Sequence, residues 1–145
     1  MADKSNKINL LLLSPEKKLF NGPVDMIIMS TTEGDIGVLH GHQPLSTVLT
    51  DGLLKIFVEG ESSAFAVFGG FAEVTPQQVT ILSDLAERPE DIDTRRAEDA
   101  RDRAERLISE RSANLDVQRA EHSSRRANVR LDASAYSILH GGKKE

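Results

Sequence analysis

The sequence contains no cysteine and no tryptophan, and only one tyrosine and five phenylalanines among its 145 residues. The absence of cysteine excludes disulfide bonds, thiolate metal ligands and a cysteine nucleophile. Because aromatic side chains are few, we expect a core that is built mainly from aliphatic residues. The length fits one ordinary domain, or a small domain with an appendage.

Long hydrophobic runs are absent too. The longest, Leu10 to Leu13 with Ile8 nearby, is far shorter than the roughly 20 residues needed to cross a bilayer. Residues 1–7 are polar and lack the apolar centre of a secretory signal, and Asp3 argues against a transit peptide. We therefore expect the chain to associate with a membrane only through partner proteins.

Charge divides the chain into two parts. Residues 1–88 hold six basic and eleven acidic side chains, whereas residues 89–145 hold twelve of each. The first part uses lysine, with Arg88 as its only arginine, while the second part has ten arginines. This shift predicts a boundary near Arg88-Pro89, which separates a domain over residues 1–88 from one over residues 89–145.

The first part is typical of an antiparallel sandwich or barrel. Its apolar and β-branched segments are short and are separated by Gly, Pro, Asn and Asp, as expected of strands joined by turns. The predicted strands are Ile8–Leu13, Val24–Ser30, Leu53–Val58, Ser63–Phe68, Phe71–Val74 and Gln78–Leu82.

The second part predicts two helices that form an antiparallel hairpin. Asp91 or Asp93 can cap the first helix, residues 112–114 form a plausible turn, and the second helix runs from about Asp116 to Leu131. Small side chains dominate both apolar stripes, which comprise Ala97, Ala100, Ala104, Leu107 and Ile108 on one helix and Ala120, Ser124, Ala127 and Leu131 on the other. Since alanine buries little apolar area, we expect a hairpin of marginal stability that is able to open.

Catalytic and metal sites have little support. His40 and His42 are two candidate metal ligands, but no third or fourth ligand follows at a recognisable spacing, so a pair of loop or interface histidines is preferred. Glu33 and Asp35 flank Gly34, which indicates an exposed acidic turn for docking rather than an acid–base pair. Gly69-Gly70 precedes a strand-like segment, which indicates a turn or bulge rather than a phosphate loop. We predict no catalytic residue and no metal.

Nucleic acid is an unsuitable partner, because acidic side chains are interleaved with the arginines of residues 89–145. Only Arg125, Arg126 and Arg130 form a local basic cluster. Such a cluster either faces solvent or attracts an anionic ligand or an acidic protein surface.

Several segments resemble the epsilon subunits of bacterial F-type ATP synthases. The most distinctive is Glu33–Leu45, followed in order by Gly69–Val74 and Ile81–Glu87, and Asn21–Val24 also fits. The resemblance covers nearly the whole chain. It implies a flattened antiparallel β-sandwich followed by a two-helix hairpin, and it places the change of fold at Arg88-Pro89.

The resemblance also implies a non-catalytic role in the central stalk. The sandwich would bind the gamma subunit and rest on the c-ring, passing torque between proton flow and ATP synthesis. Glu33 and Asp35 would lie near the c-ring, and residues 40–45, with His40, His42 and Pro44, near gamma. The hairpin would extend to the alpha and beta subunits and inhibit hydrolysis, with Arg125, Arg126 and Arg130 facing acidic residues of beta.

Some bacterial members of this family bind ATP in the folded hairpin. Their pattern matches Ile92-Asp93-Thr94-Arg95-Arg96-Ala97 together with two arginines on the last helix. The resemblance thus implies ATP as a regulatory ligand, with no cofactor required, at Glu87, Ile92, Asp93, Arg96, Ala97, Arg126 and Arg130. Asp93 is also a reasonable helix cap without any ligand.

Three alternatives are open. The first is the equivalent mitochondrial or chloroplast subunit, although the lack of a transit peptide favours a bacterial protein on the cytoplasmic face of the inner membrane. The second is a free-standing nucleotide-sensing module outside any membrane complex. The third is a small hydrolase, for which the sequence offers no acid–base pair.

Overall fold

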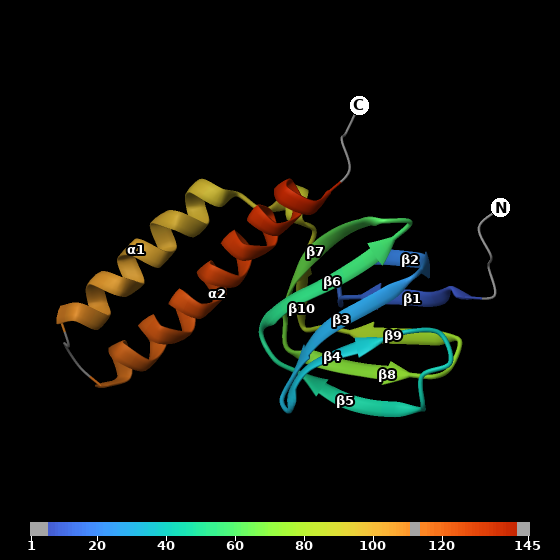
Figure 1. The fold of residues 1–145 in the computed structure, drawn as a ribbon. Coiled ribbons are helices and arrows are strands. Elements are labelled where there is room, and N and C mark those ends of the chain that lie inside the picture. Colours follow the sequence, from blue (N-terminus) through green and yellow to red (C-terminus); the bar gives the residue numbers. More distant parts are fainter. Residues whose placement is uncertain (1–5, 111–113, 142–145) are drawn as a thin grey trace.

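The computed structural model describes residues 6–110 and 114–141, without the side chains of residues 114–116. In this part of the chain, strands come first and two helices follow (Figure 1). The strands are β1 (Ile8–Leu13), β2 (Lys18–Val24), β3 (Met26–Thr31), β4 (Gly34–Val38), β5 (Leu45–Leu49), β6 (Gly52–Val58), β7 (Glu61–Phe68), β8 (Gly70–Val74), β9 (Gln78–Leu82) and β10 (Leu85–Glu87). A short 3₁₀ helix, η2 (Pro89–Asp91), leads to α1 (Thr94–Glu110) and α2 (Asn114–His140).

The strands form the two layers of a sandwich. One layer has the order β10-β7-β6-β3, with β4 also paired to β3, and the other has the order β5-β8-β9-β1-β2. A single residue pair, Thr31 with Leu49, joins β3 of the first layer to β5 of the second. All neighbouring strands are antiparallel except β1 and β9, which run parallel, so the predicted antiparallel sandwich holds with one exception.

The core between the layers is aliphatic, as the composition predicts. It combines alternate residues of both layers, among them Ile8, Leu10 and Leu12 of β1 and Ile27 and Met29 of β3, all at most 1% exposed. The strands alternate because successive side chains point to opposite faces of a sheet. This core lies within residues 8–86, so the sandwich does not need the helices to complete it.

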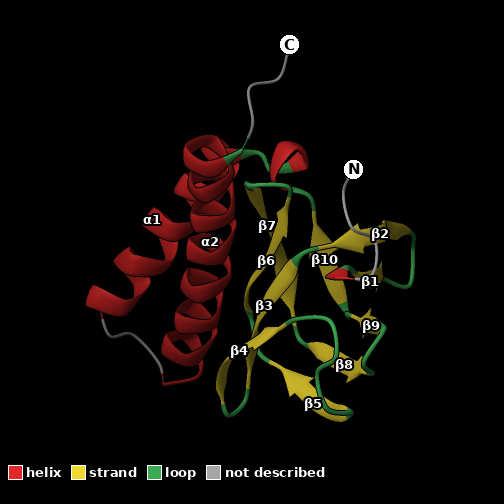
Figure 2. Cartoon of the chain, turned by 45° about the vertical axis from the view of Figure 1, so that its right-hand side comes forward, coloured by secondary structure: helices red, strands yellow, loops and turns green. Residues whose placement is uncertain are grey.

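Strand β7 departs from this alternation, since Ala64, Phe65, Ala66, Val67 and Phe68 are all buried. Phe65 and Val67 belong to the core between the layers, whereas Ala66 and Phe68 belong to a second apolar cluster with Ile92 and Ala133. Helix α2 supplies this second cluster because it packs on the outer face of β7 (Figures 1 and 2).

The helices form the predicted hairpin, and α1 packs on α2 rather than on the sandwich. Asp93 caps α1, because its Oδ1 accepts a hydrogen bond from the Arg96 amide at 3.1 Å. The two buried residues of α1 are Ala97 and Ala104, and Ala120 and Ala127 of α2 are buried as well. Leu107, which the sequence places on the same stripe, is 42% exposed.

Several predicted element boundaries are wrong. No strand was predicted within Glu33–Leu45, but β4 occupies Gly34–Val38 and pairs with β3. The predicted strand Val24–Ser30 spans a break at Asp25 between β2 and β3. Strands β2, β5 and β10 were not predicted as separate elements, and β10 has only three residues.

Helix α2 begins at Asn114 and continues to His140, nine residues beyond the predicted end at Leu131. Contacts with β7 hold this extension: the Ser137 hydroxyl accepts a hydrogen bond from the Ala64 amide at 3.1 Å, and the Tyr136 hydroxyl lies 3.1 Å from Ser62 Oγ. Asn114, assigned to the turn from the sequence, belongs to the helix, and Ser112 and Ala113 lie outside the described residues.

Candidate functional site

The acidic residues of the Glu33–Leu45 segment lie at the β3–β4 hairpin. Thr31 Oγ1 accepts a hydrogen bond from the Glu33 amide at 3.1 Å and donates one to the Gly34 carbonyl at 2.6 Å, which fixes this tight turn. Gly34 has φ 113°, which a residue with a side chain rarely adopts. Glu33 and Asp35 are both exposed, so the hairpin presents two carboxylates to solvent.

The histidines lie in the loop after β4. His40 and Pro44 are exposed, and His42 is partly buried with its Nδ1 2.7 Å from the Gln43 carbonyl oxygen. Since a carbonyl only accepts, Nδ1 carries the proton in this contact. Within residues 6–110 and 114–141, no three His, Asp or Glu side chains are grouped as metal ligands would be.

An exposed apolar row crosses the second layer of the sandwich. Val48, Phe71 and Leu82 are direct neighbours on β5, β8 and β9, because Val48 pairs with Phe71 and Phe71 pairs with Leu82. They are 48%, 63% and 51% exposed, respectively. A shallow groove of about 350 Å³ runs along the row. This row was not predicted from the sequence, because the sequence does not reveal that β5, β8 and β9 become neighbours.

Helix α2 turns two arginines toward the sandwich. Arg130 Nε lies 2.7 Å from Glu87 Oε1 at the end of β10, and Arg126 Nε lies 3.7 Å from Asp51 Oδ2, just before β6. Both guanidinium groups lie over the Phe68 ring, at 5.2 Å for Arg126 and 4.8 Å for Arg130. Arg125 is exposed and does not share this arrangement. The three predicted cluster residues are thus divided between two surfaces of α2.

The remaining candidate ATP ligands lie around the start of α1. Asp93 Oδ1 accepts from the α1 amide of Arg96, Ile92 and Ala97 are buried, and the Arg96 side chain is exposed. In the part of the chain that the structure describes, Arg96 forms no ion pair with Glu87. The structure therefore brings Glu87 and Arg130 together, and it gives Asp93, Ile92 and Ala97 roles in the fold.

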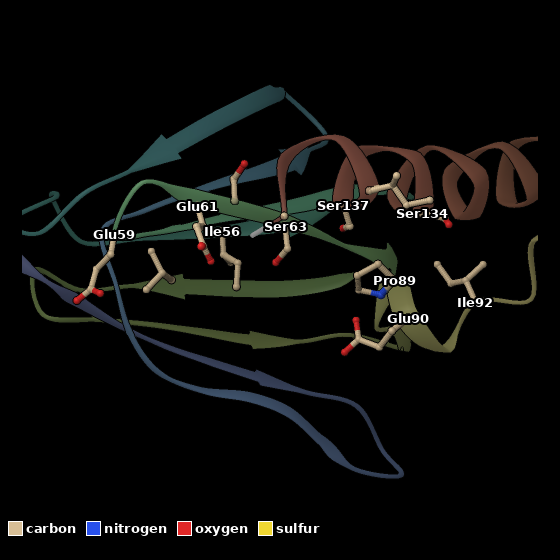
Figure 3. Close-up of a pocket in the computed structure, with 13 residues that line it drawn as sticks. Ile56, Glu59, Glu61, Ser63, Pro89, Glu90, Ile92, Ser134 and Ser137 are labelled. Atoms are coloured by element: carbon tan, nitrogen blue, oxygen red, sulfur yellow. The ribbon is translucent and has the colours of Figure 1, made fainter. Parts of the chain in front are cut away.

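Another groove lies between η2, the β6–β7 hairpin and the end of α2 (Figure 3). It has a volume of about 900 Å³, and its lining includes Glu59, Glu61 and Glu90 but neither Arg126 nor Arg130. Three carboxylates repel an anion, so this groove does not suit a polyphosphate. Within the described residues, no helix is both long and apolar enough to cross a membrane.

The comparisons with known proteins agree with this architecture. Residues 7–89 match the family model described as "ATP synthase, Delta/Epsilon chain, beta-sandwich domain", and residues 90–135 match the "long alpha-helix domain" of the same chain. The protein belongs to the ATP synthase delta/epsilon family. As a delta/epsilon chain it is a non-catalytic subunit, which agrees with the lack of a predicted catalytic residue.

Similar chains of this family are found in several organisms. The chain is 44% identical over 128 residues to the ATP synthase epsilon chain of Halalkalibacterium halodurans, which covers 88% of this chain and 96% of that one. It is 43% identical over 127 residues to the epsilon chain of Herpetosiphon aurantiacus, with 88% and 93% covered.

Among solved structures, one similar chain comes from the Euglena gracilis mitochondrial ATP synthase, in an assembly described as OSCP/F1/c-ring. The Euglena chain matches with a TM-score of 0.68 and 26% identity, and the match covers 92% of this chain and 82% of the Euglena chain. A central stalk/c-ring structure from Tetrahymena thermophila shares the fold, with a TM-score of 0.58 and 18% identity.

Proposed function

We propose that this chain is a rotor subunit in the central stalk of an F-type, proton-translocating ATP synthase, where it couples proton flow to ATP synthesis. The observation that carries the proposal is the exposed apolar row of Val48, Phe71 and Leu82, on the sandwich layer that the helical hairpin leaves uncovered. A rotor subunit needs such a face for a permanent partner while its hairpin stays free to move.

The apolar row is the proposed contact with the gamma subunit. Burying a large apolar side chain contributes roughly 1.5–3 kcal/mol, so three neighbouring ones can anchor a subunit interface. The loop with His40, His42 and Pro44 extends the proposed gamma contact beyond the β-sheet. Its exposure supports this role.

The β3–β4 hairpin is the proposed contact with the c-ring. Glu33 and Asp35 are exposed at its turn, where carboxylates can pair with basic groups on the polar loops of the ring. The chain would then lie on the cytoplasmic face of the bacterial inner membrane, attached through its partners. Its similarity to bacterial epsilon chains supports this location.

The hairpin is the proposed inhibitor of ATP hydrolysis, acting when it extends toward the alpha and beta subunits. Its contact with the sandwich is limited to one helix, and the buried residues between its two helices are mostly alanines. With such limited contacts the folded state is not far more stable than the extended one. A two-state element requires this small difference in free energy. Arg125, Arg126 and Arg130 would pair with acidic residues of beta in the extended state.

ATP is the proposed regulatory ligand of the folded hairpin. Arg126 and Arg130 both contact the Phe68 ring, which supports a site for phosphate groups beside an aromatic ring. Glu87, Ile92, Asp93, Arg96 and Ala97 complete the proposed set around the start of α1. A free-standing nucleotide sensor would use the same residues, so the assembly experiments below distinguish the two functions.

The rotor role is tested by co-expressing this chain with the gamma subunit of the same organism. We expect Phe71→Glu to abolish co-purification, because it puts a charge in the centre of the apolar row. Leu107→Glu makes the same kind of change at an exposed leucine of α1 and serves as the control. If Phe71→Glu binds gamma as the unaltered chain does, the proposed interface is wrong, and if the unaltered chain stays alone, the free-standing sensor is favoured.

The inhibitory role is tested by truncating the chain after Asp91 and measuring ATP hydrolysis by the assembled catalytic head. This end point keeps Arg88, whose Nη2 donates to the Leu19 carbonyl at 3.1 Å and so ties the end of β10 to β2. We expect faster hydrolysis with unchanged assembly. Equal rates with and without the hairpin would refute inhibition and leave only the rotor role.

A further inference from the structure

Two arginines of α2 are paired with two carboxylates of the sandwich where the helix packs on it. Arg126 and Arg130 lie one helical turn apart and therefore on the same side of α2. Each has its own carboxylate on the sandwich, Asp51 for Arg126 and Glu87 for Arg130. These carboxylates neutralise two like charges that would otherwise repel each other at this interface.

Phe68 lies close to both guanidinium groups. Its side chain is 1% exposed, and both guanidinium carbons lie within about 5 Å of its ring centroid. A cation over an aromatic face is attracted to it, and this attraction holds the arginines in place whichever anion they bind. The ring thus contacts both Arg126 and Arg130.

The two ion pairs differ in quality. Arg130 donates a hydrogen bond to Glu87 at 2.7 Å, whereas Arg126 Nε is 3.7 Å from Asp51, beyond hydrogen-bonding distance. Arg126 Nε is buried and has no hydrogen-bond acceptor within the described residues. Asp51 therefore leaves a donor of Arg126 unsatisfied, while the Arg126 side chain as a whole is 36% exposed and can be reached by another anion.

We propose that Asp51 and Glu87 act as internal competitors of any external anion that binds Arg126 and Arg130. The two carboxylates pair with the arginines when the hairpin lies on the sandwich without a ligand. These ion pairs must break when phosphate groups bind the arginines. Glu87 is among the residues proposed above to contact ATP, but Asp51 is not. Asp51 therefore competes with ATP for Arg126 without itself binding ATP. The inference rests on the proposed ATP site and adds how that site is regulated.

The inference predicts two opposite effects of Asp51→Asn. Removing the charge frees Arg126 for phosphate, so the variant binds ATP more tightly. The same change removes an ion pair from the empty hairpin, so α2 leaves the sandwich more often when no ligand is present. Since partly exposed ion pairs contribute about 0.2–1 kcal/mol, each shift should be up to about fivefold.

The test compares the full unaltered chain, Asp51→Asn and the control Glu16→Gln, which removes one exposed negative charge from the β1–β2 turn. ATP and inorganic triphosphate are titrated by calorimetry, and amide hydrogen exchange of α2 is measured without ligand. We expect Asp51→Asn alone to tighten binding of both ligands about two- to fivefold and to speed exchange in α2 by a similar factor.

The outcomes separate this inference from the ATP proposal. If ATP binds equally to all three chains, competition by Asp51 is wrong while the ATP site stands. If ATP does not bind but triphosphate does, and more tightly to Asp51→Asn, the competition stands and the ATP proposal fails. If Asp51→Asn weakens binding, Asp51 is a ligand rather than a competitor, and if neither compound binds any chain, both ideas are overturned.

Discussion

Gly70 shows how one residue can decide whether two strands pair. It begins β8 with φ 117°, and a Cβ built on it would lie 2.2 Å from the Leu82 carbonyl oxygen of β9. A side chain would therefore meet backbone, which cannot move without breaking the β8–β9 pairing. The Gly69-Gly70 turn predicted from the sequence is found, but the close approach to Leu82 was not predictable, because it depends on a neighbouring strand.

Gly70→Ala should therefore lower the free energy of unfolding by about 2–4 kcal/mol. Positive φ and the contact with Leu82 act in the same direction. Gly37→Ala is the control, because its Cβ would meet nothing within 4 Å and its φ is not positive. Urea unfolding of both variants measures the difference, and equal stabilities would contradict the argument.

Asp25 lies at the break between β2 and β3 and is held by two hydrogen bonds. The Lys7 ammonium and then the Glu59 amide, which donates at 2.6 Å, hold the pKa of Asp25 below its ordinary value of 3.8. Because the pKa is lower in the folded chain, the carboxylate stabilises the fold above pH 3.8. That contribution is lost as the pH falls through the lower, folded-state pKa.

Asp25→Asn should accordingly lower Tm near neutral pH, while the difference from the unaltered chain should shrink at about pH 2. Thermal unfolding followed by circular dichroism at both pH values measures the change. Asp35→Asn, at an exposed carboxylate, controls for loss of net charge. A difference in Tm that is the same at both pH values would show that the ionised Asp25 is not what stabilises the break.

At the scale of elements, the sequence predicts the strands whose apolar residues alternate and misses those that depend on pairing. Gln78–Leu82 and Ile8–Leu13 have their predicted bounds. β4 contains Gly34, Asp35 and Gly37, which have low strand propensity, and forms because it pairs with β3 along its full length. Asp51 was likewise not predictable as the partner of Arg126, since the two are distant in sequence, whereas the resemblance had already grouped Glu87 with Arg130.

The hairpin depends on small residues between its helices. Ala97 and Ala104 are the buried residues of α1, and α2 is the element that covers them. Their 4% and 3% exposure leaves no room for a larger side chain without separating the helices. The small-residue stripe inferred from the sequence thus determines how closely the two helices approach.

Ala104→Leu should destabilise the closed hairpin by about 1–3 kcal/mol through overpacking. Amide exchange in α1 should become faster, whereas exchange in the sandwich should not change. Ala135→Leu places the same side chain at an exposed position of α2 and should have little effect. Slower exchange in α1 of Ala104→Leu would mean that the interface has space that the leucine fills.

At the scale of the whole molecule, stability is divided between two apolar clusters. The larger lies wholly inside the sandwich, and the smaller joins α2 to β7 through Ala66, Phe68 and Ala133. Helix α1 contributes to neither and is held by α2. The molecule therefore has three parts: a sandwich with its own core, α2 packed on the sandwich, and α1 packed only on α2.

Native-state hydrogen exchange should follow this arrangement. Amides of α1 should exchange first, those of α2 facing β7 next, and those of β1, β3 and β7 only on global unfolding. Proteolysis should likewise cut the helices before the strands. Exchange of α1 and β1 with one common free energy would show instead that the hairpin and the sandwich unfold as a single cooperative unit.

The parallel pairing of β1 with β9 has a consequence for biosynthesis. Strand β1 must wait for residues 78–82 before its second neighbour exists, so one of its edges stays open while the intervening strands emerge from the ribosome. Once β10 is complete, the ordered sandwich can close before the helices have been translated. We expect the hairpin to dock onto a sandwich that has already folded.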